Sequence, residues 1–494
     1  MPEPSQDLFF YNSLTRQKER FEPLKPPFVG VYVCGPTVYG DSHLGHAKSY
    51  ITFDVVVRHL RFLGYRVRYV QNITDVGHLT EDTEEDKILK QSRLEQIEPM
   101  EVVEKYTHSY FEDMDALNIR RPDISPRASG HVPEQIEMIE TLFEKGAAYE
   151  REGNVYFSVE SFTGYGKLSG RKLEDQQAGA RVGVDAEKKN PADFLLWRKA
   201  SPDHILKWNS PWGPGYPGWH LECSVMARRY LGDTIDIHGG GLENQFPHHE
   251  CEIAQSETAT GKPFVRVWLH NNMVTRDGQK MGKSLGNFIT LKDAFTRHTP
   301  SLVRFFLLRG HYRSPIDYSA DAIHAAESGL TRLRNSRALA LEKAAAADAD
   351  PSAGGAESAS DRLAEATRIA ADAFVAAMND DINTANALAA AFDFVSELNK
   401  IADSGDAFSA ADWKAAALFF ETHLGAEGVL GIDLEGETEA GGGLDEKLVE
   451  LLLATRRTLR AEKNFALGDE IRDGLLAAGI EIKDTKEGTT WKRQ

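Results

Sequence analysis

Residues 29–69 constrain the fold more than any other stretch, because they predict a strand, a loop, a helix and a second strand. The first strand is the valine-rich apolar run 29–33, and residues 66–69 open the second. Between them we expect a helix from about Ala47, with apolar side chains at helical spacing: Phe53, Val56, Val57 and Leu60. This is a βαβ unit with a right-handed crossover. Open α/β sheets bind ligands at the carboxyl ends of such strands.

The loop of this unit carries the sequence HLGH at residues 43–46. A helix start offers free N–H groups and a positive dipole end to a phosphate, and Gly45 lets a nucleotide approach the backbone closely. Neutral His43 and His46 can donate hydrogen bonds to ATP phosphate oxygens as charge develops on them. Taken alone, the motif is equally compatible with a surface loop that holds two incidental histidines.

A second loop reads KMGKS at residues 280–284, between Gly278 and Gly286. Lys280 and Lys283 can reach one phosphate chain as mobile point charges. Together and in this order, HLGH and KMGKS resemble the HIGH and KMSKS signatures of class I aminoacyl-tRNA synthetases, with Leu44 for isoleucine and Gly282 for serine. Gly282 should loosen the lysine loop. The resemblance implies catalysis by His43, His46, Lys280 and Lys283, and ATP binding by these four residues with Gly45 and Ser284.

Composition sets bounds on compartment and partners. The chain has 494 residues, enough for several domains. Three cysteines cannot form a disulfide framework, which favours a reducing cytoplasm. No apolar run approaches the ~20 residues of a membrane span, and no signal-peptide pattern opens the chain, so we expect no membrane association. The net charge of −18 argues against a chain-wide nucleic-acid footprint, but leaves room for a local basic path.

Strand and helix patterns predict an α/β fold. We expect a split Rossmann-type nucleotide-binding domain with an inserted α/β domain, then an α-helical bundle and a small C-terminal domain. The expected parts are a first catalytic half (1–119), an inserted connective domain (120–214), a second catalytic half (215–272), a KMSKS-type loop and stem-contact region (273–320), a tRNA-binding bundle (321–435) and a C-terminal anticodon-binding domain (444–494). The roles in tRNA binding come from the resemblance.

The sequence also predicts the bounds of individual strands, helices and loops. Residues 234–241 predict a strand that runs into a glycine loop, and 264–270 predict another strand. Helices are expected over 94–117, 246–259, 293–309, 321–344 and 361–424, with a flexible loop at 345–360 and a linker at 436–443.

The last fifty residues differ in charge from the rest of the chain. Residues 445–494 carry ten Lys and Arg against ten Asp and Glu. This local neutrality and the aromatic residues Phe465 and Trp491 suit RNA contact, with either ring stacking on a base. An ordinary amphipathic helix followed by a tail explains the same residues equally well.

Four residues in three segments can be combined into one zinc site. His248 and Glu252 are four residues apart and share a helical face, whereas His249 is turned away by about 100°. Cys34 ends the first strand, and Cys223 lies where the sheet resumes. Two thiolates, an imidazole and a carboxylate are normal zinc ligands. Cys251, three residues after His248, is a rival ligand; purely structural zinc and metal-free buried cysteines are further alternatives.

A closer resemblance covers nearly the whole chain. The segments CGPTVY (34–39), GWHLECS (218–224), DIHGGG (236–241), FPHHExEIAQS (246–256, where x is Cys251), LVRFFLLRGHYRSPIDYS (302–319) and GTTWKR (488–493) resemble the cysteinyl-tRNA synthetase family. By this resemblance, the zinc ligands are Cys34, Cys223, His248 and Glu252, and Cys251 is not a ligand. The resemblance also implies an amino-acid pocket lined by Gly35, Thr74, Trp219 and His238.

The resemblance implies an activity as well. It predicts ATP-dependent activation of L-cysteine to cysteinyl-adenylate and transfer to the 3′ end of tRNA(Cys), with Mg²⁺ accompanying ATP and one zinc per subunit. Zinc would select cysteine, because a soft thiolate binds it strongly and a serine hydroxyl does not. The expected partners are tRNA(Cys), L-cysteine and ATP, and the expected state is a monomer. Two alternatives stay open: a ligase that passes cysteine to a small amine, as in mycothiol-pathway relatives, and a non-enzymatic zinc- and RNA-binding protein.

Overall fold

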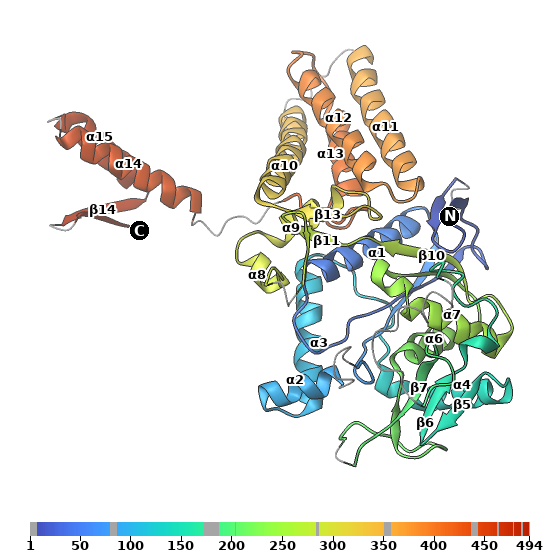
Figure 1. Cartoon of the computed structure of the whole chain (residues 1–494). Coiled ribbons are helices and arrows are strands. Elements are labelled where there is room, and N and C mark those ends of the chain that lie inside the picture. The colour runs from blue at the N-terminus through green and yellow to red at the C-terminus, as the bar shows by residue number, and fades with distance from the viewer. Residues whose placement is uncertain are drawn as a thin grey trace. The chain divides into compact units, whose positions relative to one another are not determined.

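The computed structural model describes residues 7–79, 86–171, 187–202, 204–282, 286–349, 357–435, 443–461, 464–477, 479–485 and 488–493 (Figure 1). Contacts between Cα atoms divide the chain into two compact units, 1–434 and 435–494. Within the described residues, none of the helices combines the length and the apolar character that crossing a membrane requires.

A four-stranded parallel sheet lies at the centre of the first unit. Its order is β10-β9-β3-β4, formed by Val265–Asn271, Ile235–Gly241, Phe28–Val33 and Arg66–Gln71. β3 pairs in parallel with both β4 and β9, so the two halves of the split domain meet on this strand. The predicted α/β class is therefore confirmed. Strand order reverses at β3, and open sheets bind their ligands beside the carboxyl end of such a strand.

Helix α1 (Leu44–Phe62) connects β3 to β4 and begins three residues earlier than predicted. Its N-cap is His43, whose Nδ1 accepts the backbone N–H groups of Gly45 and His46. His46 Nδ1 in turn accepts the N–H of His43. The predicted apolar side chains are all buried, and the chain turns out of the helix at Gly64, where φ is +92°.

The glycine-rich end of β9 is regular strand and not the predicted loop. Gly239, Gly240 and Gly241 continue the ladder with β10. A Cβ at Gly239 would lie 2.1 Å from the ring of Phe53 in α1, so only glycine lets the helix approach the sheet this closely.

The insertion between β4 and β9 has its own antiparallel sheet. The order is β5-β6-β7-β8, formed by Ala148–Arg151, Asn154–Phe157, Phe194–Lys199 and Gly215–Pro217, with α4 (Val132–Glu144) packed against it. Ile124 and Arg127 still bridge to Val70 and Ile73 beside β4, so strand pairing places the start of the insertion after Arg127 and its end at β8. Helix α6 (Trp219–Leu231) follows directly and leads the chain back to β9.

Two helices predicted as continuous are each broken in two. Residues 94–117 form the end of α2 (Lys87–Glu95) and α3 (Pro99–Ala116), separated at Gln96, where φ is +57°. Residues 293–309 form most of α8 (Leu291–Phe295) and α9 (Pro300–Leu308). In both cases a proline opens the second helix, where its fixed φ is favourable and its missing N–H is not needed.

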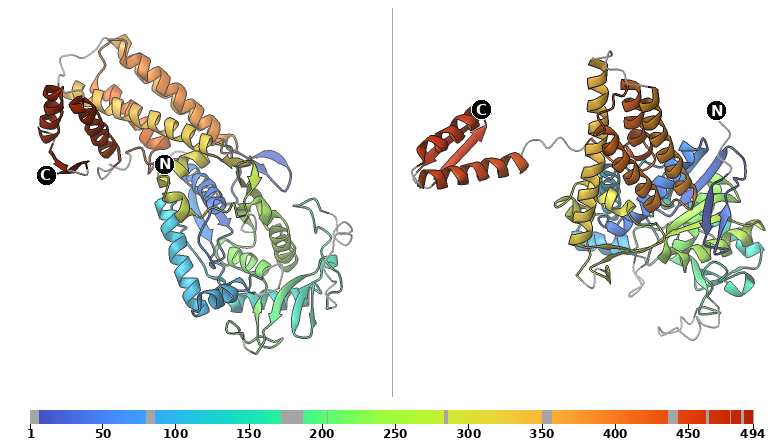
Figure 2. Two further views of the ribbon diagram at one scale, coloured as in Figure 1. Left: turned by 60° about the vertical axis from the view of Figure 1, so that its left-hand side comes forward. Right: turned by 90° about the horizontal axis from the view of Figure 1, so that it is seen from above.

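Smaller elements complete the first unit. They include the hairpin of β1 and β2 (Phe9–Asn12 and Gln17–Arg20) and helix α7 (His248–Thr260). A three-stranded sheet consists of β11, β12 and β13 (Val274–Arg276, Gln279–Lys280 and Ile316–Tyr318). The helical bundle consists of α10 (Ala320–Ala349), α11 (Glu357–Asn379), α12 (Thr384–Ala402) and α13 (Ala410–Phe419), and a π-helical turn at Phe420–Leu424 follows α13 (Figure 2). The loop predicted at 345–360 is partly wrong, because α10 and α11 occupy both its ends and only 350–356 lie outside the described residues.

A buried carboxylate joins helix α1 to the end of the helical bundle. Asp54 in α1 contacts both Arg58 and Arg304, and all three side chains are almost completely buried. The remaining guanidinium N–H groups donate to backbone carbonyls of two loops. Arg304 reaches Leu117 and Leu430, and Arg58 reaches Asn118, Ala426 and Gly428.

The second unit is a pair of helices with a hairpin. Helices α14 (Gly443–Ala461) and α15 (Phe465–Ala477) precede β14 (Ile480–Thr485) and β15 (Gly488–Arg493). Val449, Leu453 and Leu475 form its core, and Trp491 packs against them, whereas Phe465 is 53% exposed. Phe465 is therefore the more accessible of the two aromatic residues. Residues 436–442 of the predicted linker lie outside the described residues.

Candidate functional site

Two cavities lie at the carboxyl ends of the parallel strands. The thiol-lined cavity, about 950 Å³, is bordered by Cys34, Cys223 and Trp219. The histidine-lined cavity, about 620 Å³, is bordered by the HLGH histidines and by Lys280. The two share wall residues and therefore adjoin: Thr37, His43, Gly45, His46, His78, Lys87 and Glu243.

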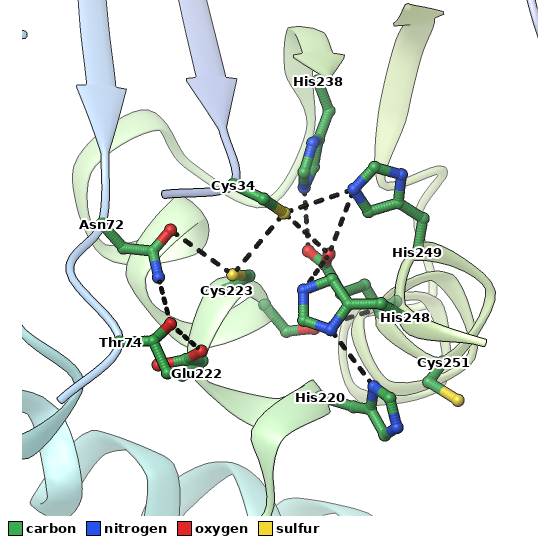
Figure 3. A network of polar contacts seen from close by, with 12 residues as sticks. Cys34, Asn72, Thr74, His220, Glu222, Cys223, His238, His248, His249 and Cys251 are labelled. Atoms are coloured by element: carbon green, nitrogen blue, oxygen red, sulfur yellow. Dashed lines mark hydrogen bonds and ion pairs between the residues drawn. The ribbon is translucent and has the colours of Figure 1, made fainter. Parts of the chain in front are cut away.

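The four residues predicted as zinc ligands come together beside the thiol-lined cavity, whose wall includes Cys34, Cys223 and His248 (Figure 3). Cys34 follows β3, Cys223 lies in α6, and His248 and Glu252 lie on α7. Their donor atoms are all within 4.8 Å of one another, and all four side chains are buried. The two Sγ atoms are 3.8 Å apart, and His248 Nε2 is 3.2 Å from Glu252 Oε1.

His249 also faces this cluster, so the expectation that it turns away is wrong. Its Nε2 is 3.2 Å from Cys34 Sγ, and its Nδ1 is 2.8 Å from His270 Nε2. The donor atoms gather around the first turn of α7, so neighbouring residues of that turn flank them. Cys34, His238, His249 and Glu252 consequently form a second possible donor set. Neither His238 nor His249 borders the two cavities.

Cys251, the rival ligand, faces away from the cluster (Figure 3). Its Sγ is 3.5 Å from the hydroxyl of Tyr165, and its side chain belongs to the core shared with the inserted domain. Among the described residues it is in neither donor set.

Burial governs the protonation of the donors. It raises the pKa of the Cys34 thiol to about 12 and that of Cys223 well above its ordinary value. It also lowers the pKa of His248 and of His249 well below the ordinary value. Without a nearby cation, the thiols keep their protons and the imidazoles stay neutral. A metal binds such sulfur, nitrogen and oxygen donors by displacing thiol protons, and this donor set fits zinc.

Three of the residues predicted for the amino-acid pocket border the thiol-lined cavity, and one does not. Gly35, Thr74 and Trp219 are in its wall, and the Trp219 ring stacks between His78 and His248, at centroid distances of 4.1 and 4.4 Å. His238 is fully buried, and its Nε2 is 2.8 Å from Glu252 Oε2. It therefore orients a carboxylate of the cluster.

Four further residues of the thiol-lined cavity's wall are outside the sets predicted for catalysis, ATP, cysteine and zinc: Asn72, His78, Lys87 and Glu222. Asn72 holds Gly35 through its Oδ1, which accepts the glycine N–H at 2.8 Å. Lys87 lies 2.6 Å from His78 Nε2, at the junction of the two cavities. Glu222 contacts Thr74. The rule that ligand-binding residues gather at the carboxyl ends of parallel strands points to Asn72 and His78, which follow β4, whereas no pattern in the sequence singles out Lys87 or Glu222.

The HLGH histidines have defined hydrogen-bonding roles. The rings of His43 and His46 stack at 3.8 Å, and each Nδ1 accepts a backbone N–H. In a neutral ring the hydrogen must then be on Nε2, which makes this atom a donor.

The lysine loop is anchored at its start. Asn287 accepts the N–H of Gly282 and donates to the carbonyl of Lys280. Lys283 and Ser284 lie outside the described residues, so their expected roles stay predictions.

Comparisons with known proteins agree along the whole chain. A family profile described as tRNA synthetases class I (C) catalytic domain matches residues 20–328, and one described as DALR domain matches 373–435. The cysteine–tRNA ligase of Chlorobium luteolum is 56% identical, covering 98% of this chain and 99% of its own length. That of Thermus thermophilus is 49% identical with the same coverage.

A solved structure of Mycobacterium tuberculosis methionyl-tRNA synthetase with methionyl-adenylate superposes with a TM-score of 0.58, covering 80% of this chain and 91% of the other. Its 16% identity shows a common fold only. The full-length matches decide the family: the chain belongs to the cysteine–tRNA ligases, within the class I aminoacyl-tRNA synthetases.

Proposed function

We propose that this chain activates L-cysteine with ATP, transfers the cysteinyl group to tRNA(Cys), and holds one zinc ion through Cys34, Cys223, His248 and Glu252. The convergence of these four buried donors within 4.8 Å, beside a cavity that the HLGH histidines also border, carries the proposal. The family membership established above supports the same reaction.

The cavity wall favours this donor set over the alternative set. Cys34, Cys223 and His248 border the thiol-lined cavity, so a metal there is accessible to a substrate. A metal between His238 and His249 would be enclosed behind them. Bound at the accessible position, zinc would supply a soft Lewis acid that accepts the thiolate of cysteine and discriminates against the hydroxyl of serine.

Adenylation needs positioning and charge stabilisation. The substrate carboxylate is already an anionic nucleophile, so attack on the α-phosphate of ATP requires no protein base. A carboxylate oxygen bonds to phosphorus, and the bond to pyrophosphate breaks. The Nε2–H groups of His43 and His46 donate to phosphate oxygens as charge develops there, and Lys280 with Lys283 balances it. Ser284 and a Mg²⁺ ion with the ATP complete the proposed nucleotide site.

The remaining parts of the proposal concern the partner RNA and the state of the chain. We assign tRNA contact to the helical bundle and to the second unit, where Phe465 offers an exposed ring. We expect a monomer in a reducing cytoplasm, in keeping with three free thiols.

ATP–pyrophosphate exchange dependent on the amino acid tests the activity. We expect exchange with cysteine, little with serine, and loss of exchange after zinc chelation, with recovery on zinc addition. Charging of tRNA(Cys) then separates a synthetase from a ligase that uses a small amine. Absence of exchange from folded, zinc-loaded protein would overturn the proposal, and exchange that survives complete zinc removal would overturn the role of the metal.

A further inference from the structure

A buried carboxylate beside the zinc donors has one oxygen without a partner. Glu222 lies in the first turn of α6, is 2% exposed, and borders the thiol-lined cavity. Its Oε1 accepts the hydroxyl hydrogen of Thr74. Within the described residues, no hydrogen-bond donor reaches its Oε2. An unmatched buried carboxylate oxygen is unfavourable, which points to a donor or cation that the folded chain does not itself supply.

A chain of hydrogen bonds fixes the polarity of the neighbouring groups (Figure 3). The N–H of Gly35 donates to Asn72 Oδ1 at 2.8 Å, so the other end of this amide is the donor. Asn72 Nδ2 donates to Thr74 Oγ1 at 3.1 Å. Thr74 uses its single hydrogen on Glu222, so its second lone pair is left to accept.

This corner of the cavity therefore offers hydrogen-bond acceptors, among them a carboxyl group that a bound cation would keep ionised. It suits a group that carries several N–H hydrogens and a positive charge. Cys223 follows Glu222 in sequence, and its Sγ is 3.6 Å from Asn72 Oδ1, so the corner is next to the thiol-binding position. The thiol and ammonium groups of cysteine are likewise close together, because they are bonded to adjacent carbon atoms.

We propose that Glu222 and Thr74 form the subsite for the α-ammonium group of the substrate amino acid. Thr74 accepts one N–H and orients its hydroxyl toward Glu222, and the Glu222 carboxylate supplies the opposing charge. The zinc donors would then serve the thiol of the substrate, and this pair its α-amino group. The inference rests on the proposed function, because it takes cysteine as the substrate.

The test compares two ligands that differ in the ammonium group. Cysteine carries it, and 3-mercaptopropionate has the same thiol and carboxylate without it. In Glu222→Gln, the carboxamide keeps an acceptor for Thr74 but loses the charge. We expect the KM for cysteine in ATP–pyrophosphate exchange to rise roughly 10- to 100-fold, the range for one charge-assisted hydrogen bond in a buried site. The inhibition constant of 3-mercaptopropionate and the KM for ATP should stay unchanged.

Two further variants keep the test decisive. Thr74→Val removes the hydroxyl and should likewise weaken cysteine more than 3-mercaptopropionate, so the inference can be judged even if Glu222→Gln does not fold. Glu250→Gln is the matched control: this carboxylate is equally buried, but it accepts backbone N–H groups of Leu168 and Ser169 and borders neither cavity. It should leave both constants unchanged.

The outcomes separate the inference from the proposed function. No exchange with cysteine by the parent enzyme would overturn the function itself. Exchange by the parent, with both ligands weakened equally in Glu222→Gln or with zinc lost from that variant, would give Glu222 a merely structural role. An unchanged KM for cysteine in a folded variant would remove the ammonium subsite.

Discussion

The three cysteines of the chain are all buried, yet their surroundings differ. Cys34 and Cys223 face each other and a carboxylate, whereas Cys251 faces the Tyr165 hydroxyl and apolar side chains. Burial therefore does not distinguish a ligand from a packing residue, but the chemistry of the nearest groups does.

Replacing single cysteines should separate these roles. We expect Cys223→Ala to lower bound zinc from about one ion per chain to near zero, because a three-donor site of this kind is far weaker. Cys251→Ala should keep its zinc and lose about 1 kcal/mol of folding stability from the shortened core side chain. Metal analysis of both purified variants measures this, and equal zinc loss in both would contradict the assigned donor set.

Gly35 tolerates no side chain. A Cβ there would lie 1.5 Å from the carbonyl oxygen of Asn72, a backbone atom. We expect Gly35→Ala to displace the segment that carries Thr74, lowering the free energy of unfolding by roughly 3 kcal/mol or more and raising the KM for cysteine. Gly130 is the control, because a Cβ meets nothing within 4 Å. Chemical unfolding and exchange assays on both alanine variants test this, and two equally stable variants would refute it.

Much of the candidate site was predictable from sequence because its residues occur in recognisable motifs. His249 was not predictable, because the 100° between successive helical residues excludes it only if the site lies on one side of the helix. Here the donor atoms surround the first turn of α7, so His249 faces them as well. Glu222 was not predictable either, because its role depends on Thr74, which is distant in sequence and which the fold brings next to it.

At the scale of elements, the hydrophobic patterns predicted the parallel sheet and its insertion. They predicted the ends of the helices less accurately. Helix α1 starts at Leu44 because histidines cap it, and histidine is not among the usual N-cap residues. The break after α2 depends on Gln96 in a left-handed conformation, which apolar spacing does not reveal. Tertiary contacts decide such positions.

The contact between α1 and α11 should stabilise the fold less at low pH. His59 Nε2 contacts Asn379 Oδ1 at 2.8 Å, and burial lowers the pKa of His59 to about 4 from 6.5. The unfolded chain therefore binds more protons between these values, and this contribution to stability is lost as pH falls from 6.5 to 4. At pH 5 the loss is about 2 kcal/mol.

His59→Gln isolates this contribution, since an amide can donate to Asn379 but does not titrate. The difference in unfolding free energy between parent and variant should change by about 2 kcal/mol, in favour of the variant, between pH 7 and pH 5. Urea unfolding at both values measures it. A difference that does not depend on pH would contradict the assignment.

At the scale of the molecule, the second unit has its own core. A chain ending at Leu434 should keep exchange with cysteine within about twofold, because the described cavity walls lie in the first unit. Its kcat/KM for tRNA(Cys) should fall tenfold or more, on the order of losing a stacked base.

Full-length variants control for the truncation. Phe465→Ala should reproduce part of the defect in tRNA charging, whereas Leu467→Ala, at a position of similar exposure, should not. Equal charging by the truncated and full-length chains would assign RNA recognition to the first unit alone.

The buried contact of Asp54 with Arg58 and Arg304 bears on how such enzymes can be recombined. Helix α1 runs unbroken from the HLGH histidines to this contact, and the arginines bind the backbone that ends the helical bundle. The helical bundle therefore cannot be exchanged between such enzymes as an independent part. A chimera that imports a foreign bundle must import the 426–431 segment with the same path, or two buried guanidinium groups each lose backbone acceptors.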